Sequence, residues 1–339
     1  VEPETIALLE ELVRDAASPR ERALLGGALA VELAYDSDPV RRAEISDAAV
    51  GAARDTGDAA VLGRVLNNFA IANWQPARRH ERRAALDEAL ALRGVPREAE
   101  AIALLHRAPI ALRRADLAAC EADLARAESL TRRLGVPELV AQLGTQRAGL
   151  ALLEGRADAA ELSAAASAEL AQTSLWGTEW VRLMFAASVA RARDEAGAVV
   201  DELVAHASRP EWELLRPTAA LLVAEAGDAE RAVALLGRWG LTRIPALDHW
   251  CGDLLLAQLA MCAALTGTPD PDAAYTALLP WAGELVVAGT GIACWGTVDA
   301  TLAALARRRG DPHAADAHEE ASARLTAHVG AQLGRPPHW

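Results

Sequence analysis

The segment Gly310-Asp311-Pro312-His313-Ala314-Ala315 has close copies at residues 155–160 and 227–232, which read GRADAA and GDAERA. In each copy the glycine can end one helix, and an acidic residue or a proline can begin the next. A small residue five positions after the glycine lets the two helices pack closely, and two copies have another, Ser167 or Ser322, seven positions later. The segment therefore predicts a pair of packed helices joined by a short turn.

Breaks of this kind recur along the whole chain. They fall at positions 38, 76, 115, 155, 197, 227, 267 and 310, and most intervals are close to 40 residues. A second set of breaks lies between them, at 56–58, 94–96, 135–137, 176–178, 208–210 and 243–245. Each unit reads as helix A, a turn, helix B and a second turn. This is the logic of a tetratricopeptide repeat, lengthened from about 34 to about 40 residues.

The sequence therefore predicts an all-α fold, a right-handed α-α superhelix. We expect a tetratricopeptide-like solenoid of about eight helical hairpins, forming a single helical-repeat domain over residues 1–339. Within it we expect an N-terminal capping hairpin at 1–56, central repeats at 57–242, C-terminal repeats at 243–330 and a tail at 331–339. Because each repeat of a solenoid contacts only its neighbours, an elongated molecule is expected.

Composition excludes several classes of protein. The net charge of −13 disfavours a nucleic-acid binder, because phosphate contacts need a basic face. The chain has no lysine, so it has no Walker A phosphate loop. No uncharged apolar run is long enough to span a membrane, and four scattered cysteines indicate neither disulfides nor a zinc site. We expect a cytoplasmic protein, and the start at Val1 suggests a fragment or a processed chain.

One glycine-rich segment imitates a dinucleotide-binding motif. Residues 285–288 (LVVA) resemble a short strand, and Gly289-Thr290-Gly291 then leads toward a helix. The third glycine of the motif would fall at position 294, which is Cys294, and no alternation of strands and helices surrounds the segment. We therefore interpret it as a turn between helices and expect no cofactor.

Histidine and cysteine side chains do not form a recognisable metal site. His249 and Cys251 lie close together between two aspartates, whereas His313 and His318 are five residues apart. Ligands on one helix are usually three or four residues apart. We interpret the histidines as surface residues and expect no metal and no catalytic residue.

Tryptophan is the most unusual component, with nine residues against two Phe and two Tyr. Most of them are expected to fill gaps in an alanine-rich core. The alternative is an aromatic groove on the concave side, where the A helices of stacked hairpins lie. Aromatic faces, amides and arginines on these helices are the mixture that a ligand site needs. The candidate groove residues are Asn68, Trp74, Arg107, Gln146, Trp176, Trp180 and Arg182.

Three C-terminal segments carry a family resemblance. They are residues 250–257 (WCGDLLLA), residues 274–283 (AYTALLPWAG) and residues 287–296 (VAGTGIACWG), the last leading through Leu302 to Gly310-Asp311. Together they resemble the helical-repeat region of large actinobacterial regulators among the MalT-like signal-transduction ATPases, which include LuxR-type and antibiotic-regulatory-type transcription factors. The resemblance implies a sensor region that follows ATPase and DNA-binding modules, and this chain contains neither module. It implies no individual ligand residues.

We therefore expect a sensing or interaction module of a larger cytoplasmic transcriptional regulator. A small-molecule or peptide ligand, or another module of the same regulator, would bind in the concave groove and control a neighbouring ATPase or DNA-binding module. Direct contact with nucleic acid or a membrane is not expected. Two alternatives remain: a standalone tetratricopeptide-type scaffold for peptides or proteins, and an α-helical enzyme with its site in the groove. No paired acid and base stands out to support the enzyme.

Overall fold

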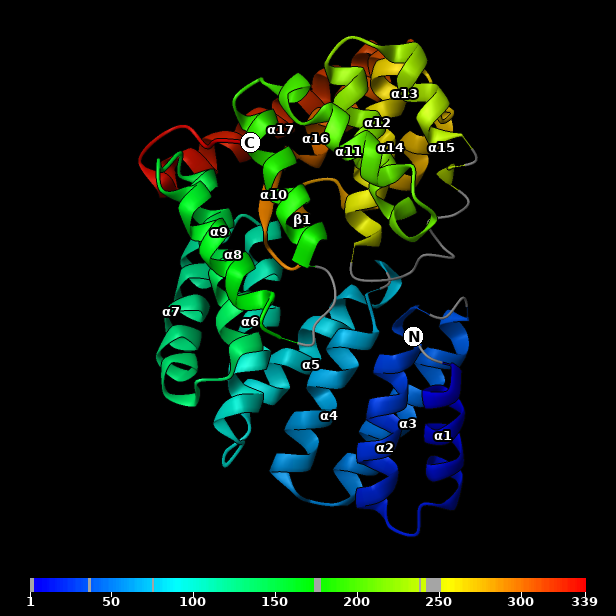
Figure 1. Cartoon of the computed structure of the whole chain (residues 1–339), viewed down its shortest axis with the longest axis vertical. Helices are drawn as coiled ribbons and strands as arrows, with labels where there is room; N and C mark the ends of the chain where they lie inside the picture. Colours follow the sequence, from blue (N-terminus) through cyan, green and yellow to red (C-terminus); the bar gives the residue numbers. More distant parts are fainter. Residues whose placement is uncertain (1–2, 36–37, 75, 174–177, 238, 242–250) are drawn as a thin grey trace.

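The computed structural model describes residues 3–35, 38–74, 76–173, 178–237, 239–241 and 251–339. Nearly all the regular structure in this part of the chain is helical, and it repeats as antiparallel pairs of helices (Figure 1). The predicted all-α helical-repeat fold is thus confirmed. No helix of the described part is both long and apolar enough to cross a membrane.

After α1 (Pro3–Asp15), the first half of the chain forms four hairpins, each an A helix followed by a B helix. They are α2 (Pro19–Glu32) with α3 (Pro39–Asp55), α4 (Ala59–Ala72) with α5 (Arg79–Ala91), α6 (Arg97–Arg113) with α7 (Leu117–Leu134), and α8 (Pro137–Leu153) with α9 (Ala159–Leu170). Short 3₁₀-helices, η1 (Leu33–Tyr35) and η2 (Pro76–Arg78), follow α2 and precede α5. Consecutive A helices pack against one another.

The second half continues the same order. Its hairpins are α10 (Thr178–Ala192) with α11 (Val200–Ala207), α12 (Arg216–Glu225) with α13 (Ala229–Leu236), α14 (Gly252–Thr266) with α15 (Pro271–Leu278), and α16 (Val298–Arg308) with α17 (Pro312–Leu333). The 3₁₀-helices η3 (Ala196–Ala198), η4 (Pro210–Leu215) and η7 (Leu279–Trp281) lie in the connections of this half. Within the described residues, helices end and begin at the predicted breaks, whereas 176–177 and 243–245 lie outside these residues. The break between α1 and α2 was not predicted, so the N-terminal segment 1–56 holds α1, α2 and α3 rather than the single capping hairpin expected.

The turns form for the reasons that the sequence indicates. Gly310 has a φ of 76°, a left-handed conformation that favours glycine, and Asp311 caps α17 by accepting a 2.9 Å hydrogen bond from a backbone N–H. The turn at residues 227–228 has the same arrangement. In the copy at residues 155–160 the turn is longer, and α9 begins at Ala159. The small residue buried between the two helices is therefore Ala159 rather than Ala160, the residue five positions after the glycine.

The glycine-rich segment is more than the inter-helix turn that the sequence predicts. Strands β1 (Leu285–Ala288) and β2 (Ala293–Thr297) pair antiparallel, with Val287 opposite Cys294. Every residue of both strands is buried. Leu285 and Val287 pack in one hydrophobic cluster with α6–α8, while Val286 and Ala288 pack in another with the C-terminal helices. Because side chains alternate along a strand, one continuous apolar run fills two cores.

This β-hairpin lies inside the curve of the array. The helical hairpins run from the lower right of Figure 1, through the left, to the upper right, and β1 is drawn in the space that they surround. β1 contacts α6 and α14, whereas β2 contacts α8, α10, α16 and α17. The hairpin therefore joins repeats that are far apart along the chain.

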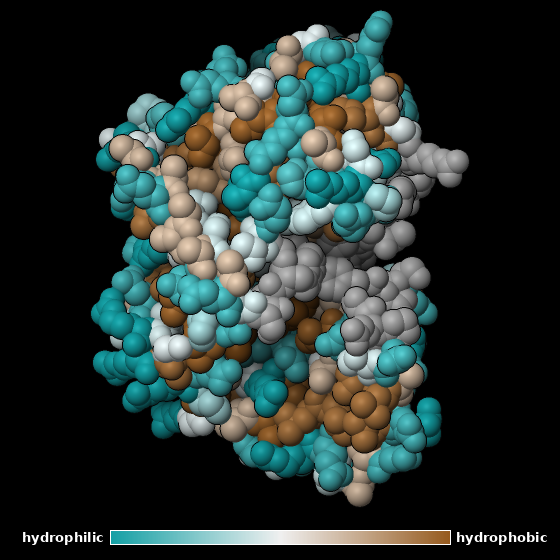
Figure 2. Space-filling view, in the orientation of Figure 1, coloured by the Kyte–Doolittle hydropathy of each residue, from teal (hydrophilic) through white to brown (hydrophobic). Residues whose placement is uncertain are grey.

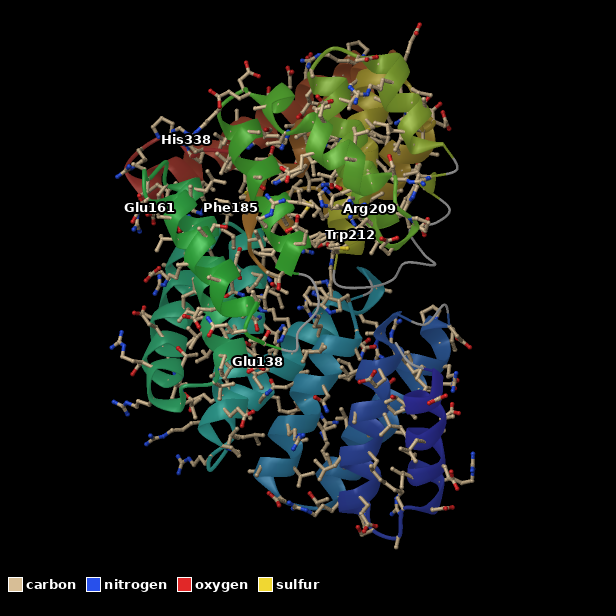
Figure 3. All side chains as sticks on the ribbon, viewed as in Figure 1. Glu138, Glu161, Phe185, Arg209, Trp212 and His338 are labelled. Atoms are coloured by element: carbon tan, nitrogen blue, oxygen red, sulfur yellow. The ribbon has the colours of Figure 1, made fainter. Side chains whose placement is uncertain are left out.

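The expectation that repeats contact only their neighbours is consequently wrong. Arg79 of α5 donates a 2.8 Å hydrogen bond to the carbonyl oxygen of Pro280, 201 residues away. Gln332 of α17 bonds to the start of α7. The backbone N–H of His338, whose side chain is labelled in Figure 3, donates to the carbonyl oxygen of Leu153 at 2.9 Å. These bonds fold the array back on itself, which an open solenoid would not require.

Candidate functional site

Six of the seven residues assigned to a groove from the sequence are described, and they are spread over several parts of the array. Asn68 is half-buried on α4, beside Gly27 of α2. Trp74 follows α4, and the guanidinium carbon of Arg82 lies 3.4 Å from the centroid of its ring. The ring of His106 meets Trp74 edge-on, with 6.5 Å between centroids. Trp74 is thus a contact between α4, α5 and α6.

The two partners of Trp74 are buried polar groups. Arg82 donates from Nε to the carbonyl oxygen of Ala70 at 2.8 Å, while its Nη2 meets no acceptor among the described residues. Burial lowers the pKa of Arg82 to about 9, and burial together with the charge of Arg82 lowers that of His106 to about 3. A separate cavity, lined by Arg113 of α6 and Asp253 of α14 among others, measures only about 20 Å³. That volume suits about one water molecule.

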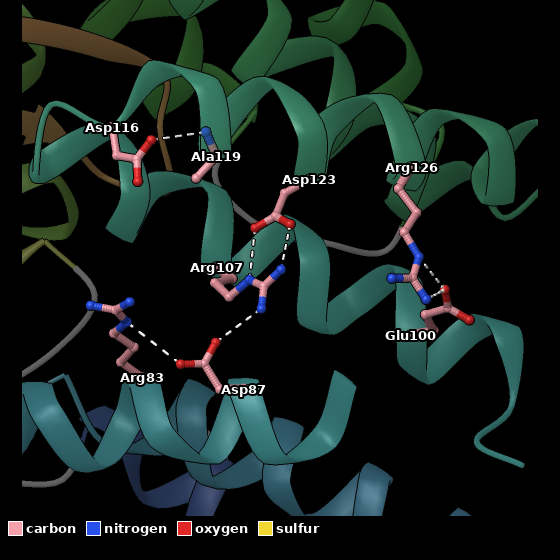
Figure 4. A network of polar contacts seen from close by, with 8 residues as sticks. All are labelled: Arg83, Asp87, Glu100, Arg107, Asp116, Ala119, Asp123 and Arg126. Carbon is pink, nitrogen blue, oxygen red and sulfur yellow. Dashed lines mark hydrogen bonds and ion pairs between the residues drawn. The ribbon is translucent and has the colours of Figure 1, made fainter. Parts of the chain in front are cut away.

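Arg107 points toward the B helices. It donates to both oxygens of Asp123 on α7, at 2.8 and 2.6 Å, and to Asp87 on α5 at 2.9 Å (Figure 4). The bonds to Asp123 are the main reason that the pKa of Arg107 is raised above its ordinary value. A mixed-charge cleft of about 270 Å³ adjoins this network. Two carboxylates already occupy the donors of Arg107, so this side chain links α6 to α5 and α7.

Gln146 is buried against the β-hairpin. Its Nε2 donates to the carbonyl oxygens of Leu105, at 2.8 Å, and Thr290, at 2.6 Å. The carbonyl oxygen of Leu105 lacks its usual helical donor because Pro109, four residues later, has no N–H. In the middle of the array, the concave face is therefore occupied by the chain itself.

The remaining predicted groove residues lie on or just before α10. Trp180 is a core residue, only 4% exposed. Arg182 donates to Glu179 and Glu202, so it links α10 to α11. Trp176 lies outside the described residues. The structure thus does not bring the six described residues together around one cavity, and the role of all seven in binding stays a prediction.

Another cavity does lie on the A helices, in the C-terminal half. It has a volume of about 300 Å³, and we call it the Trp295 pocket. Four A helices (α10, α12, α14 and α16), strand β2, helix α17 and the tail all contribute to its walls. The residues used in the argument below are Arg191, Glu225, Met261, Trp295, Thr301 and Trp339. Ligand sites typically combine such apolar walls with a few polar groups.

Trp295 is held rigidly beneath this pocket. Its Nε1 donates a 2.7 Å hydrogen bond to Ser188 Oγ, and the side chain of Trp295 is buried. The guanidinium of Arg191 lies over the ring, 4.7 Å from the centroid, at cation–π distance. Arg191 in turn donates from Nε to both oxygens of Glu225, at 2.9 and 3.0 Å. One end of the pocket therefore carries a neutralised ion pair.

The opposite side of the Trp295 pocket is built by the C-terminal elements. Thr297 and Ser322 share a 2.6 Å hydrogen bond between their hydroxyl groups, which fixes β2 to α17. Trp339 packs over Gly296, and a Cβ there would lie 3.5 Å from the indole. The φ of 96° at Gly296 also favours glycine. The tail residue Trp339 therefore forms a wall of the cavity.

His318 is not the surface residue that the sequence predicts. Its Nδ1 lies 2.7 Å from Asp299 Oδ1, and its Nε2 lies 2.9 Å from the hydroxyl oxygen of Tyr275. Asp299 also accepts a hydrogen bond from the backbone N–H of Gly283. These bonds connect α15, α16, α17 and the segment before β1, whereas His313 is exposed as expected.

The thiol groups are buried as well. All four cysteines are free, and burial raises the pKa of Cys120 and of Cys294 to about 12. Thiols with such pKa values are poor nucleophiles at neutral pH. Among the described residues, no cluster of His, Cys, Asp or Glu has the arrangement of a metal site.

Comparisons with known proteins identify no relative: no family model, no curated protein and no solved structure matches this chain. The geometry of the Trp295 pocket is therefore the main guide to function. Sequence reasoning missed this site because it placed the groove in the middle repeats. The sequence feature that could have indicated this site is a group of small residues on α14 and α16 that line the pocket with Trp295. They are Ala264, Ala300 and Ala304.

Proposed function

We propose that this chain is a ligand-sensing helical-repeat module and that the Trp295 pocket is its binding site. The observation that supports it best is the convergence of four A helices, β2 and α17 on one cavity of about 300 Å³ with a largely apolar lining. A ligand there would touch elements that belong to four consecutive hairpins. Binding would therefore favour one relative arrangement of those hairpins.

The β-hairpin supplies a route from the pocket to the rest of the array. Trp295 and Thr297 line the pocket on β2, and β2 also contacts α8, while β1 contacts α6. A ligand that binds one arrangement of the C-terminal hairpins more tightly would shift the population of that arrangement. In a cytoplasmic transcriptional regulator of the MalT-like kind, this shift would control a neighbouring ATPase or DNA-binding module.

A pocket-filling variant tests the proposal. Ala304 is half-buried in the pocket wall, so Ala304→Phe places a ring in the cavity, whereas Ala122 is exposed on α7 and Ala122→Phe is a matched control. A thermal-shift screen of small molecules should find compounds that raise the Tm of the wild type and of Ala122→Phe but not of Ala304→Phe. If every stabilising compound acts equally on both variants, the pocket is not the binding site.

Helix α1 favours a second candidate function, docking of a partner helix. It packs on α2 as a B helix packs on the next A helix. Leu8 and Leu12, one turn apart, are 56% and 42% exposed, and Figure 2 shows hydrophobic surface over the N-terminal helices. Glu4, Glu11 and Asp15 are exposed on the same face. The partner would be an amphipathic helix with basic flanks.

The model peptide LKKLLKLLKKLLKL, which forms a basic amphipathic helix, is a suitable probe of this face. It should bind the wild type, and the double change Leu8→Asp and Leu12→Asp should weaken binding at least ten-fold. Val233 is an exposed apolar residue on α13, so Val233→Asp is the control. Equal binding by all three proteins would count against docking at α1.

A further inference from the structure

The charges that line the Trp295 pocket cancel. Among its described lining residues the only ionic side chains are Arg191 and Glu225, and they form a close pair through Nε and Nη2 of the arginine. Their side chains are 17% and 24% exposed, so the pair is largely removed from water. A ligand at this end therefore meets a neutral unit rather than a free cation.

One nitrogen of the arginine in this pair has no hydrogen-bond acceptor in the described part of the chain. Arg191 Nη1 is buried and meets no acceptor among the described residues, although Nε and Nη2 are both used. A buried donor without a partner is costly, so an acceptor supplied by a ligand would be favourable. Both oxygens of Glu225 face the guanidinium, and an incoming carboxylate would lie close to this negative charge. The unused donor thus suits an uncharged acceptor.

The other polar side-chain groups of the lining are hydroxyls and the indole N–H groups of two tryptophans, and several of them are engaged. Thr297 Oγ1 accepts from the backbone N–H of Ala300 as well as bonding to Ser322. Thr301 belongs to the same lining. The rest of the wall is made of alanines, Leu265, Gly296, the thioether of Met261 and the indoles of Trp295 and Trp339. These surfaces favour a flat, apolar molecule and provide no further charge.

Resting on the proposed function, we infer that the Trp295 pocket selects an uncharged, mainly apolar molecule with a carbonyl-type acceptor, and that the Arg191–Glu225 pair excludes carboxylates. The arginine positions the acceptor, while the glutamate sets the charge that the pocket accepts. Removing the charge of Glu225 should therefore change which ligand binds rather than whether the pocket binds.

A matched pair of probes tests this specificity. Naphthalene-2-carboxamide and naphthalene-2-carboxylate share the same ring and differ in charge. We expect the wild type to bind the carboxamide at least ten-fold more tightly, measured by calorimetric titration at pH 7. Glu225→Gln keeps a hydrogen-bonding oxygen beside Arg191 and should raise the affinity for the carboxylate at least ten-fold. Glu230→Gln, an exposed position on α13, is the control and should behave as the wild type.

The possible outcomes distinguish a failure of the inferred specificity from a failure of the proposed function. Equal affinity of the wild type for both probes, or no gain of carboxylate binding in Glu225→Gln, would overturn the inference and leave the proposed function standing. Binding of neither probe by the wild type would count against the pocket as a site for small apolar molecules, and so against both. Loss of all binding in Glu225→Gln with a normal Tm would show that the glutamate itself holds the ligand, which also contradicts the inference.

Discussion

Gln146 Nε2 donates a 2.6 Å hydrogen bond to the carbonyl oxygen of Thr290, which lies 144 residues further along the chain. The same nitrogen satisfies the carbonyl oxygen of Leu105, which Pro109 leaves without a helical donor. Gly291 packs against both Gln146 and Pro109. A proline in one A helix, a glutamine in the next and the tip of the β-hairpin thus form one interlocked contact.

Changing Gln146→Leu should destabilise the protein. The buried carbonyl oxygen of Leu105 and the partly buried one of Thr290 would lose their donor, and the loss at a buried group costs about 1–3 kcal/mol. Chemical denaturation measures the free energy of unfolding. In the Gln146→Leu background, Pro109→Ala restores an N–H for Leu105 and should cost less than it does in the wild type. Strictly additive effects of the two substitutions would contradict the shared role of Leu105.

Gly149 allows the β-hairpin to approach α8. A Cβ at this position would lie 2.4 Å from the carbonyl oxygen of Ile292 and 2.5 Å from that of Gly291, both of them backbone atoms. Gly149→Ala should therefore lower the free energy of unfolding by about 1–3 kcal/mol, the cost of overpacking. Gly51 is a helical glycine with no atom near its Cβ position, so Gly51→Ala should instead stabilise the protein by about 0.5–1 kcal/mol. Equal Tm changes of the same sign would show that the hairpin does not press on α8.

The repeat pattern could be predicted because its determinants are local. Gly310 ends a helix and Asp311 caps the next within a few residues, and both effects are visible in the sequence. The β-hairpin depends on contacts that are distant in sequence. Gly149 in α8 and the β-hairpin that contains the apolar run 285–288 meet only in the folded chain. The sequence therefore indicated that this run resembles a strand, but not which helices pack against it.

His106 should make stability depend on pH. Burial, aided by the charge of Arg82, lowers its pKa to about 3, whereas an unfolded histidine has a pKa of about 6.5. Between these values the unfolded state binds more protons, so this contribution to stability is present above about pH 6.5 and is lost as the pH falls. The slope is at most about 1.4 kcal/mol per pH unit.

Denaturation curves for the wild type and His106→Phe at several pH values from 7 to 4 provide the measurement. As the pH falls, the free energy of unfolding of the wild type should decrease relative to that of His106→Phe. Substitution of the exposed His313 by Phe controls for the loss of an imidazole. Parallel curves for the wild type and His106→Phe would mean that His106 is not buried as a neutral ring.

Trp180 should behave as a core residue. Trp180 is only 4% exposed and packs in the hydrophobic cluster of α10 and its neighbours. Trp180→Ala should therefore lower the free energy of unfolding by about 3–5 kcal/mol. Trp180→Phe keeps an aromatic ring and should cost less. A folded Trp180→Ala variant with an unchanged Tm would contradict the packing described for α10.

The candidate site was less predictable than the fold for a specific reason. The predicted groove residues were chosen because they lie on A helices, on the assumption that the concave face is open. Gln146 lies on an A helix, but the β-hairpin covers it. Arg107 and Arg182 lie on A helices too, yet their carboxylate partners on B helices draw them away from the concave side. The C-terminal A helices, with Trp295 on the hairpin, line the cavity proposed as the ligand site.

The two methionines allow the most direct test of the Trp295 pocket. Met261 lines the pocket, whereas Met184 is fully buried in the core and serves as an internal control. Protein labelled with ¹³C at the methionine methyl groups should give two signals, which the variant Met184→Leu assigns. Saturation with naphthalene-2-carboxamide should shift the Met261 signal strongly and leave Met184 nearly unchanged. An unmoved Met261 signal at a concentration where calorimetry detects binding would contradict the assignment of this pocket as the ligand site.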